Sequence, residues 1–133
     1  MSAVYLNELG VICALGADRA QIAQALFQPQ LAGSAPSDAV IPGRSLVVGA
    51  VQSALPSLQD LPVALHGRNN ALLLAALQQI EPAARAAIAR YGSERVAVVM
   101  GTSTSGIGES EEVLGTYNAS GQWPPQFDYA QQE

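Results

Sequence analysis

The stretch that most constrains the fold is RVAVVMGTSTSGIGESEE, residues 95–112. Five consecutive apolar residues, 96–100, run into a loop rich in Gly, Ser and Thr, and three glutamates follow. A continuous apolar run bounded by turn residues is typical of a strand buried on both faces, as in parallel sheets covered by helices. The sequence therefore predicts an α/β protein in which residues 96–100 form an interior strand.

The loop at residues 101–108 has the composition of a ligand-facing turn. It contains three glycines and four hydroxyl side chains, and open α/β proteins place their ligands at the carboxyl ends of strands. A phosphate is disfavoured because the chain has no lysine, the GxGxxG spacing is absent, and Glu109, Glu111 and Glu112 already answer the helix dipole. From the residues alone, a purely structural strand-to-helix turn is an equally good interpretation.

Length and charge limit the function classes. A chain of 133 residues suits one domain, which would bury roughly two-thirds of its unfolded surface if it closed on itself. The net charge is −5, and the six arginines are spread along the chain. A nucleic-acid partner would need clustered cations, so none is expected.

The balance of apolar and charged residues is unusual. Charged residues make up 13% and hydrophobic residues 49% of the chain, whereas soluble domains usually carry about 25% charged residues. We therefore expect another surface to cover much of this one. The single cysteine and the absence of a Cys/His cluster predict no disulfide, metal or cofactor, and no apolar run approaches the ~18 residues of a membrane span. A soluble cytoplasmic protein is expected.

The rest of the chain alternates strands and helices. The expected elements, in order, are a strand at 3–8, an apolar turn at 10–16, a helix at 18–27, a surface loop at 30–44, a strand at 45–51, a helix at 71–77, a second helix from Pro82 to Gly92, the strand at 96–100, and a helix at 109–119. This order predicts a layered α/β fold whose mixed, partly parallel sheet is covered by helices.

Two of these helices carry clear local signals. Asp18 is the expected N-cap of the first helix, with Ile22, Ala25 and Leu26 as its buried stripe. The run ALLLAAL at residues 71–77 is apolar nearly all round, which predicts a helix buried on most sides.

Few residues could carry chemistry. Cys13 lies in an apolar turn without a neighbouring cation or histidine, which is typical of a small buried hydrophobe. His66, the only histidine, stands in a loop before a helix, where a surface or capping role is the simpler interpretation. No Ser/His/acid set can be assembled from sequence.

Four segments together carry a family resemblance. They are NELGVICALG at 7–16, HGRNNALLLAALQQI at 66–80, RVAVVMGTSTSGIGESEE at 95–112 and GQWPPQFDYAQQE at 121–133. In order and spacing they resemble the N-terminal part of a β-ketoacyl-acyl carrier protein synthase, a ketosynthase of the thiolase superfamily. The details are most similar to the ketosynthases of bacterial aryl-polyene clusters, and the resemblance covers nearly the whole chain.

The resemblance implies a thiolase-like fold of which residues 1–133 are the N-terminal portion, truncated before the nucleophile region. Family members are acyltransferases of fatty acid or polyene biosynthesis. Their cysteine takes an acyl chain, and the carbanion from malonyl-carrier protein attacks it in a decarboxylative Claisen condensation. The catalytic cysteine and two histidines have no counterparts here, since neither Cys13 nor His66 falls at those positions. The chain alone is expected to be inactive.

The resemblance also implies roles for six residues. These are Thr104 and Ile107 at the acyl pocket, Arg68 and His66 at the docking site of an acyl carrier protein, and Phe127 and Tyr129 near the dimer interface and pocket. A helix-flanking surface cation and ordinary core packing are the simpler interpretations of the second and third pairs. The implied partners are acyl carrier protein and a second ketosynthase or ketosynthase-like subunit, in a homodimer or heterodimer.

Two other functions stay open at this point. The parent could be a chain-length factor, a ketosynthase-like partner that lacks the cysteine and acts by binding. Alternatively, the chain could be a small self-contained α/β binding module. A self-contained module predicts a closed core, whereas part of a larger fold predicts exposed sheet edges.

Overall fold

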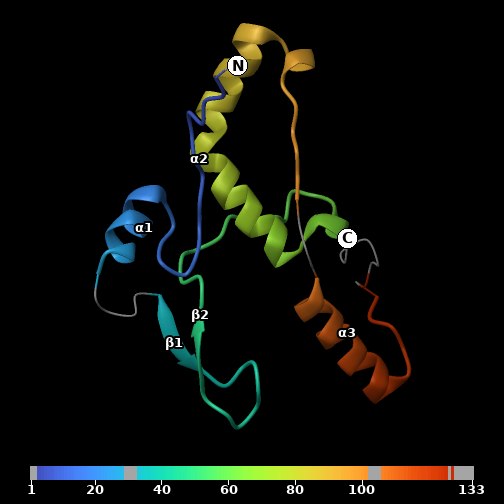
Figure 1. Cartoon of the computed structure of the whole chain (residues 1–133). Coiled ribbons are helices and arrows are strands. Elements are labelled where there is room, and N and C mark those ends of the chain that lie inside the picture. The colour runs from blue at the N-terminus through green and yellow to red at the C-terminus, as the bar shows by residue number, and fades with distance from the viewer. Residues whose placement is uncertain (1–2, 29–32, 102–105, 126, 128–133) are drawn as a thin grey trace.

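Helix α2, Arg68–Tyr91, forms the spine of the structure (Figure 1). The computed structural model describes residues 3–28, 33–101, 106–125 and 127. The other elements are α1 at Arg19–Leu26, β1 at Ser34–Ser37, β2 at Leu46–Gly49, α3 at Ile107–Ser120, and the short 3₁₀ helices η1 at Val63–Leu65 and η2 at Ser93–Arg95.

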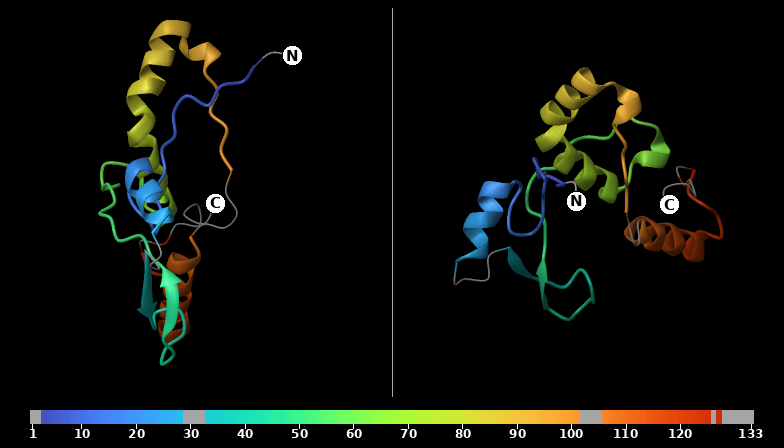
Figure 2. Two further views of the ribbon diagram at one scale, coloured as in Figure 1. Left: turned by 60° about the vertical axis from the view of Figure 1, so that its left-hand side comes forward. Right: turned by 45° about the horizontal axis from the view of Figure 1, so that its top comes forward.

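The elements spread out from α2. Helix α1 and the β1–β2 pair lie on one side of it, and α3 lies on the other side, near the N-terminal end of α2 (Figures 1 and 2). After η2, the chain returns alongside α2 in an extended conformation before it enters α3. The mixed α/β character predicted from sequence is confirmed.

Helix α1 begins as its sequence predicts. Asp18 has an extended backbone, and its Oδ1 accepts a hydrogen bond from the backbone N–H of Gln21 at 2.9 Å, which is the geometry of an N-cap. The predicted buried stripe is wrong at Leu26, which is exposed, while Ile22 and Ala25 are half-buried. The described elements place no apolar surface over that end of the helix.

Helix α2 is one continuous helix of 24 residues, so the prediction of two helices divided at Pro82 is wrong. Proline lacks one backbone donor, but the turns on either side of Pro82 hold the helix together. Gly92 ends the helix with φ of +87°, as the sequence predicts. The side chains of Glu81 and Arg85 pair one turn apart, with 2.6 Å between Oε1 and the guanidinium nitrogen.

The predicted deep burial of residues 71–77 is also wrong. Ala71 is 8% exposed and is the only buried hydrophobic side chain among the described residues, whereas Leu73 and Leu77 are exposed. The apolar pattern indicates that several faces of α2 are suited to packing against other elements. The described segments cover only part of the helix surface.

One side chain joins the N-terminal turn to α2. The backbone of Cys13 and Gly16 exchanges two hydrogen bonds, of 3.0 and 3.1 Å, which closes the predicted apolar turn. From α2, the Gln79 side chain donates to the carbonyl oxygens of Val11 and Ala17, at 3.0 and 2.9 Å. It also accepts from the Val11 N–H at 3.2 Å. The turn is therefore fixed to the middle of α2.

The described sheet is two-stranded and antiparallel. Strand β2 lies within the strand predicted at 45–51, but β1 falls in the segment predicted to be a surface loop. The register pairs Ser34 with Gly49 and Ser37 with Leu46. Local pairing explains the difference, because a short connection lets residues 34–37 supply the backbone partner that β2 needs.

The parallel part of the predicted sheet is absent from the described residues. Residues 3–8 and 96–100, predicted to be strands, have no strand pairing, although Val96 has extended dihedrals of −113° and 114°. The burial predicted for residues 96–100 is likewise wrong in this structure, because Val98 is 81% and Val99 is 92% exposed. A strand is defined by a hydrogen-bonded neighbour, and no described segment supplies one.

The chain as a whole exposes far more surface than a closed domain. Its accessible surface is 10549 Å². A closed domain of its mass, 13.8 kDa, would expose roughly 6,600 Å². Within the described residues, no helix is long and apolar enough to cross a membrane.

Candidate functional site

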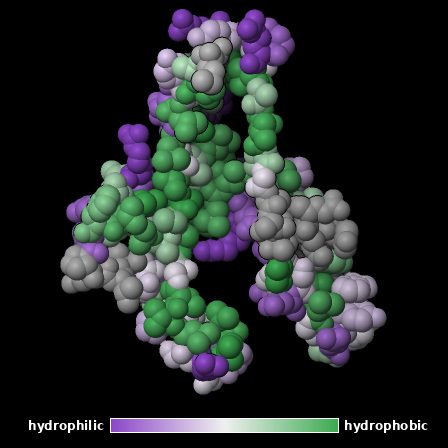
Figure 3. All heavy atoms as spheres, in the orientation of Figure 1, coloured by the Kyte–Doolittle hydropathy of each residue, from purple (hydrophilic) through white to green (hydrophobic). Residues whose placement is uncertain are grey.

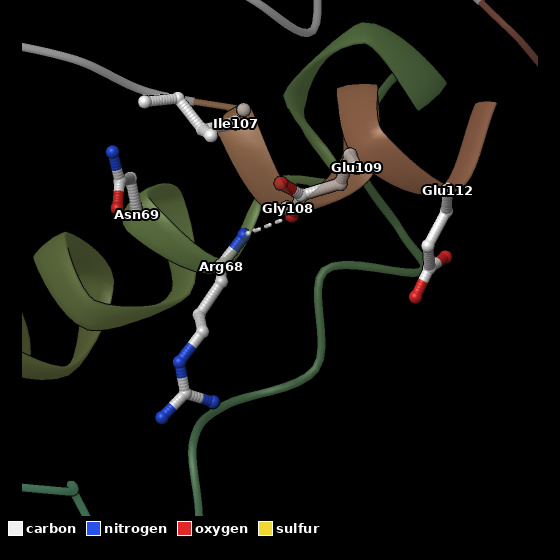
Figure 4. Close-up of a pocket in the computed structure, with 7 residues that line it drawn as sticks. Arg68, Asn69, Ile107, Gly108, Glu109 and Glu112 are labelled. Carbon is white, nitrogen blue, oxygen red and sulfur yellow. Dashed lines mark hydrogen bonds between the residues drawn. The ribbon is translucent and has the colours of Figure 1, made fainter. Parts of the chain in front are cut away.

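The first turns of α2 and α3 meet and line an open cavity of about 440 Å³. The backbone N–H of Arg68, the first residue of α2, donates to Oε1 of Glu109 in the first turn of α3 at 3.3 Å (Figure 4). The residues that line the cavity are Arg68, Asn69, Gly106, Ile107, Gly108, Glu109 and Glu112. Two segments about 40 residues apart in sequence are thus joined at their helix starts.

The start of α3 depends on Gly106. This residue is the N-cap and has φ of +67° and ψ of 13°, in the left-handed region where a side chain would be strained. Its carbonyl oxygen accepts from the N–H and from Oγ of Ser110, at 2.8 and 2.6 Å. The glycine-rich loop therefore turns directly into the helix, with Ile107 as its first residue.

The electrostatics of the cavity disfavour an anion. The cavity lies at the N-termini of two helices, but the carboxylate of Glu109 accepts from the backbone N–H of Arg68 and Glu112 adds a second negative charge. The Arg68 side chain extends away from Glu109 and Glu112 (Figure 4). This arrangement agrees with the rejection of a phosphate site on sequence grounds.

The side chains that line the cavity limit the chemistry that its described part can supply. The described lining contains no cysteine, serine or histidine, and Glu109 and Glu112 are its carboxylates. Within the part of the chain that the structure describes, no group of three His, Cys, Asp or Glu side chains could hold a metal ion. Ile107, 54% exposed, supplies the apolar side chain of the lining.

The structure brings two of the predicted site residues together. Ile107, expected at the acyl pocket, and Arg68, expected at the carrier-protein docking site, line the same cavity. Thr104 lies outside the described residues, as does Tyr129. Their roles stay predictions.

His66 lies beside this site and is engaged by its own loop. Its Nε2 is 2.9 Å from the carbonyl oxygen of Leu61, which requires that nitrogen to carry the proton and donate. The half-buried ring thus fixes the loop that leads into α2. The docking role of His66 stays a prediction.

Phe127 belongs to an aromatic stack that begins with Tyr117 in α3. Its ring lies 5.2 Å from that of Trp123, and Trp123 lies 4.4 Å from Tyr117, with interplanar angles of 18° and 20°. Stacked rings at these separations are favourable beyond the area they bury. Phe127 therefore packs within this chain, and its contribution to a dimer interface stays a prediction.

Cys13 is a half-buried free thiol in the N-terminal turn and is not among the residues that line the cavity. Sequence reasoning missed the residue that holds this turn, Gln79. The sequence did carry a signal for this role, because the amide side chain of Gln79 follows the apolar run of α2 closely. A polar side chain at such a position needs hydrogen-bond partners if another segment packs over it.

Sequence reasoning also missed a groove of about 180 Å³ between the loop before α2 and the helix itself. The lining residues are Leu58, Leu61, Leu65, Asn70, Leu73, Leu74 and Leu77. The recurrence of leucine in both segments was visible in sequence, but their approach to each other was not.

No protein-family model matches this chain, and no curated protein matches it. A comparison with solved structures does find a similar protein. Its fold and sequence place the resemblance among ketosynthases. The matching chain comes from the complex titled as the ketosynthase ApeO with its chain length factor ApeC from Xenorhabdus doucetiae, at 39% identity and a TM-score of 0.82.

The match extends over 97% of this chain and 33% of the other chain, so this chain spans about a third of the length of its structural neighbour. The resemblance to ketosynthases found in four sequence segments is therefore confirmed over almost all 133 residues.

Proposed function

We propose that this chain is the N-terminal portion of a ketosynthase-type subunit. The parent condenses an acyl thioester with malonyl-carrier protein in a decarboxylative Claisen condensation, in the cytoplasm. The observation that carries the proposal is the 39% identity, sustained over 97% of the chain at a TM-score of 0.82, to a chain of the ApeO–ApeC complex. Identity at this level over so long an alignment supports a related role as well as a related fold.

In this proposal the cavity at the start of α3 becomes part of the wall of an acyl pocket. Ile107 offers an apolar side chain, and the glycines on either side of it let a chain approach the backbone. The two carboxylates disfavour anionic ligands, which agrees with an uncharged aliphatic or polyene chain. Thr104 is assigned to the same wall on the strength of the resemblance alone.

The proposed partners are a carrier protein and a second subunit. Carrier proteins are acidic, so they would meet a cationic side chain, and the exposed Arg68 extends away from the two glutamates (Figure 4). A heterodimer is favoured for the second subunit because the structural neighbour is a chain from a complex of a ketosynthase with its chain length factor.

A chain length factor is the second candidate function, because the neighbouring complex contains one. Both kinds of subunit would use the same fold, and they differ in whether the polypeptide carries the acyl-accepting cysteine. Incubating the full protein and its partner with an acyl-carrier protein, followed by mass spectrometry of each polypeptide, separates them. A thioester on the polypeptide that contains α2 and α3 indicates the ketosynthase, and a thioester on its partner indicates the chain length factor.

The pocket assignment is tested with Ile107→Phe in the full protein and its partner. A larger side chain at this wall should shorten the longest acyl product, measured by mass spectrometry of products released from the carrier protein. Val47→Phe is the matched control, since Val47 is exposed on β2, away from the cavity. An unchanged product length with Ile107→Phe would contradict the assignment.

A further inference from the structure

Helix α2 begins without a capping side chain of its own. Its N-cap is Gly67, which has no side chain and an extended backbone with φ of −90° and ψ of 150°. A helix start leaves its first N–H groups without partners inside the helix, and an N-cap side chain normally accepts from one of them. The N–H of Arg68, one of these groups, donates instead to Oε1 of Glu109, 41 residues further along the chain. Glu109 therefore supplies α2 with an acceptor from another helix.

The same carboxylate lies in the first turn of α3, whose own N-cap, Gly106, also has no side chain. A negative charge near a helix N-terminus is favourable, because that end carries the positive pole of the helix dipole. Glu109 is half-buried and meets this condition for both helices at once. One side chain thus joins the starts of α2 and α3 (Figure 4).

The contact between the two helix starts is polar on the side of α2. Figure 3 shows hydrophilic residues at this end of α2, beneath a visible face that is otherwise largely hydrophobic. The Arg68 side chain extends away from Glu109, so the backbone N–H of Arg68 is the donor that holds the link (Figure 4). A hydrogen bond depends on distance and direction, whereas apolar burial is non-directional. The link therefore sets the position of the first turn of α3 relative to α2.

Ile107 lies in the turn that this link holds. It is the first residue of α3, two positions before Glu109, and both side chains line the same cavity. Two hydrogen bonds close the turn, because the carbonyl oxygen of Gly106 accepts from the N–H and from Oγ of Ser110. A shift of Glu109 relative to α2 would therefore carry Ile107 with it.

We propose that Glu109 is a positioning residue, which sets how far the Ile107 wall of the acyl pocket stands from α2 and thereby limits the length of the acyl chain. The inference rests on the proposed function, in which this cavity forms part of the pocket wall. In this role Glu109 acts through Ile107 and takes no part in the making or breaking of bonds.

Glu109→Ala in the full protein with its partner tests the proposal. Alanine removes the acceptor, so the first turn of α3 is no longer held to α2 and the wall can yield to a longer chain. The ratio of products longer than the normal limit to products at that limit should rise on the order of fivefold, as for the loss of one hydrogen bond of ordinary strength. Mass spectrometry of products released from the carrier protein measures this ratio. Glu109→Gln keeps an oxygen acceptor and should retain most of the normal distribution.

Gly67→Ser separates the position of α3 from the stability of α2. A Cβ at Gly67 would meet no described atom within 4 Å, and serine is a favoured N-cap residue, so this substitution gives α2 a cap from its own chain. Combined with Glu109→Ala, it should restore the amide protection of the first turn of α2 but leave the product ratio raised. Restoration of the normal ratio would show that Glu109 only stabilises α2, and it would overturn the proposal. The double variant also keeps the test available should Glu109→Ala alone not fold.

Glu111→Ala is the matched control for charge, since Glu111 is exposed on the same helix and is not among the residues that line the cavity. It should leave the product ratio unchanged. An equal rise with both alanine variants would overturn the proposal, as would normal products with an unchanged ratio in Glu109→Ala. If the unsubstituted protein and its partner form no condensation product at all, the proposed function fails and the inference fails with it.

Discussion

Residues 10–17 contact α2 and are fixed to it, whereas residues 97–101 run beside the helix without being fixed to it. Gln79 bonds the first segment at three backbone atoms, while no described hydrogen bond holds the second. The difference shows that two kinds of structural feature are encoded in the sequence in different ways. A local turn with a polar anchor forms from residues within this chain, whereas an interior strand forms only where its neighbours are present.

The strongest test of this contrast removes the anchor. Gln79→Ala deletes the side-chain bonds to Val11 and Ala17, and the backbone groups left behind are half-buried. We expect a local loss of about 3 kcal/mol, or on the order of 100-fold in amide protection of the turn at 13–16. Hydrogen exchange measures it.

Gln78→Ala is the control for that experiment, because Gln78 is the exposed neighbour on the same helix. The anchor is assigned wrongly if the two alanine variants protect the turn equally. Residues 97–101 should exchange at the same rate in both variants, since they are not held by this contact.

A second test crowds the contact between Gly10 and α2. A Cβ at Gly10 would collide with the carbonyl oxygen of Ala76, so Gly10→Ala must push the segment off the helix. We expect a loss of about 2 kcal/mol, read from urea unfolding of the assembled protein by circular dichroism.

Gly115→Ala provides a control of opposite sign. Gly115 lies inside α3 with open space around it, so alanine should stabilise that helix by about 0.5–1 kcal/mol. If Gly10→Ala is also neutral or stabilising, the contact with α2 is looser than described.

A third test concerns the N-cap of α1, which was predicted correctly from the sequence. Asp18→Ala removes the acceptor for the Gln21 N–H and should lower the stability of α1 by about 1 kcal/mol. Asp18→Asn keeps an acceptor and should retain most of that stability. Exchange of the first-turn amides of α1 distinguishes the variants, and equal exchange in all three proteins would show that the cap contributes nothing.

The predictable features share a physical basis. The cap at Asp18, the turn closed by Cys13 and Gly16, strand β2 and the stop at Gly92 depend on interactions within a few residues or on backbone dihedrals, so sequence predicts them. The sequence analysis did not predict that α2 continues through Pro82. Proline removes one hydrogen bond from the helix, but the turns on either side keep theirs, so the helix stays intact.

The candidate site was predictable only in part. Ile107 and Arg68 were named through a family resemblance, but their meeting at one cavity depends on the link between Arg68 and Glu109 across 41 residues. The burial predicted for residues 96–100 failed for a different reason. The apolar pattern indicates that the strand needs a covering layer on both of its faces. The described residues do not supply those layers, so the side chains stay exposed.

The smallest expected effect concerns the hydrogen bond between Arg68 and Glu109, which links the first turns of α2 and α3. Glu109→Gln keeps an oxygen acceptor for the Arg68 N–H but removes the charge that faces the N-terminus of α2. The bond is long, 3.3 Å, so we expect a loss of only about 0.5 kcal/mol at low salt in the protection of the first turn of α2. Added salt should shrink the difference from the unsubstituted protein, because exposed charges are screened. Glu111→Gln, at an exposed position of the same helix, is the control. An equal effect from both substitutions would mean that net charge, rather than the contact between α2 and α3, governs how the two helices are held.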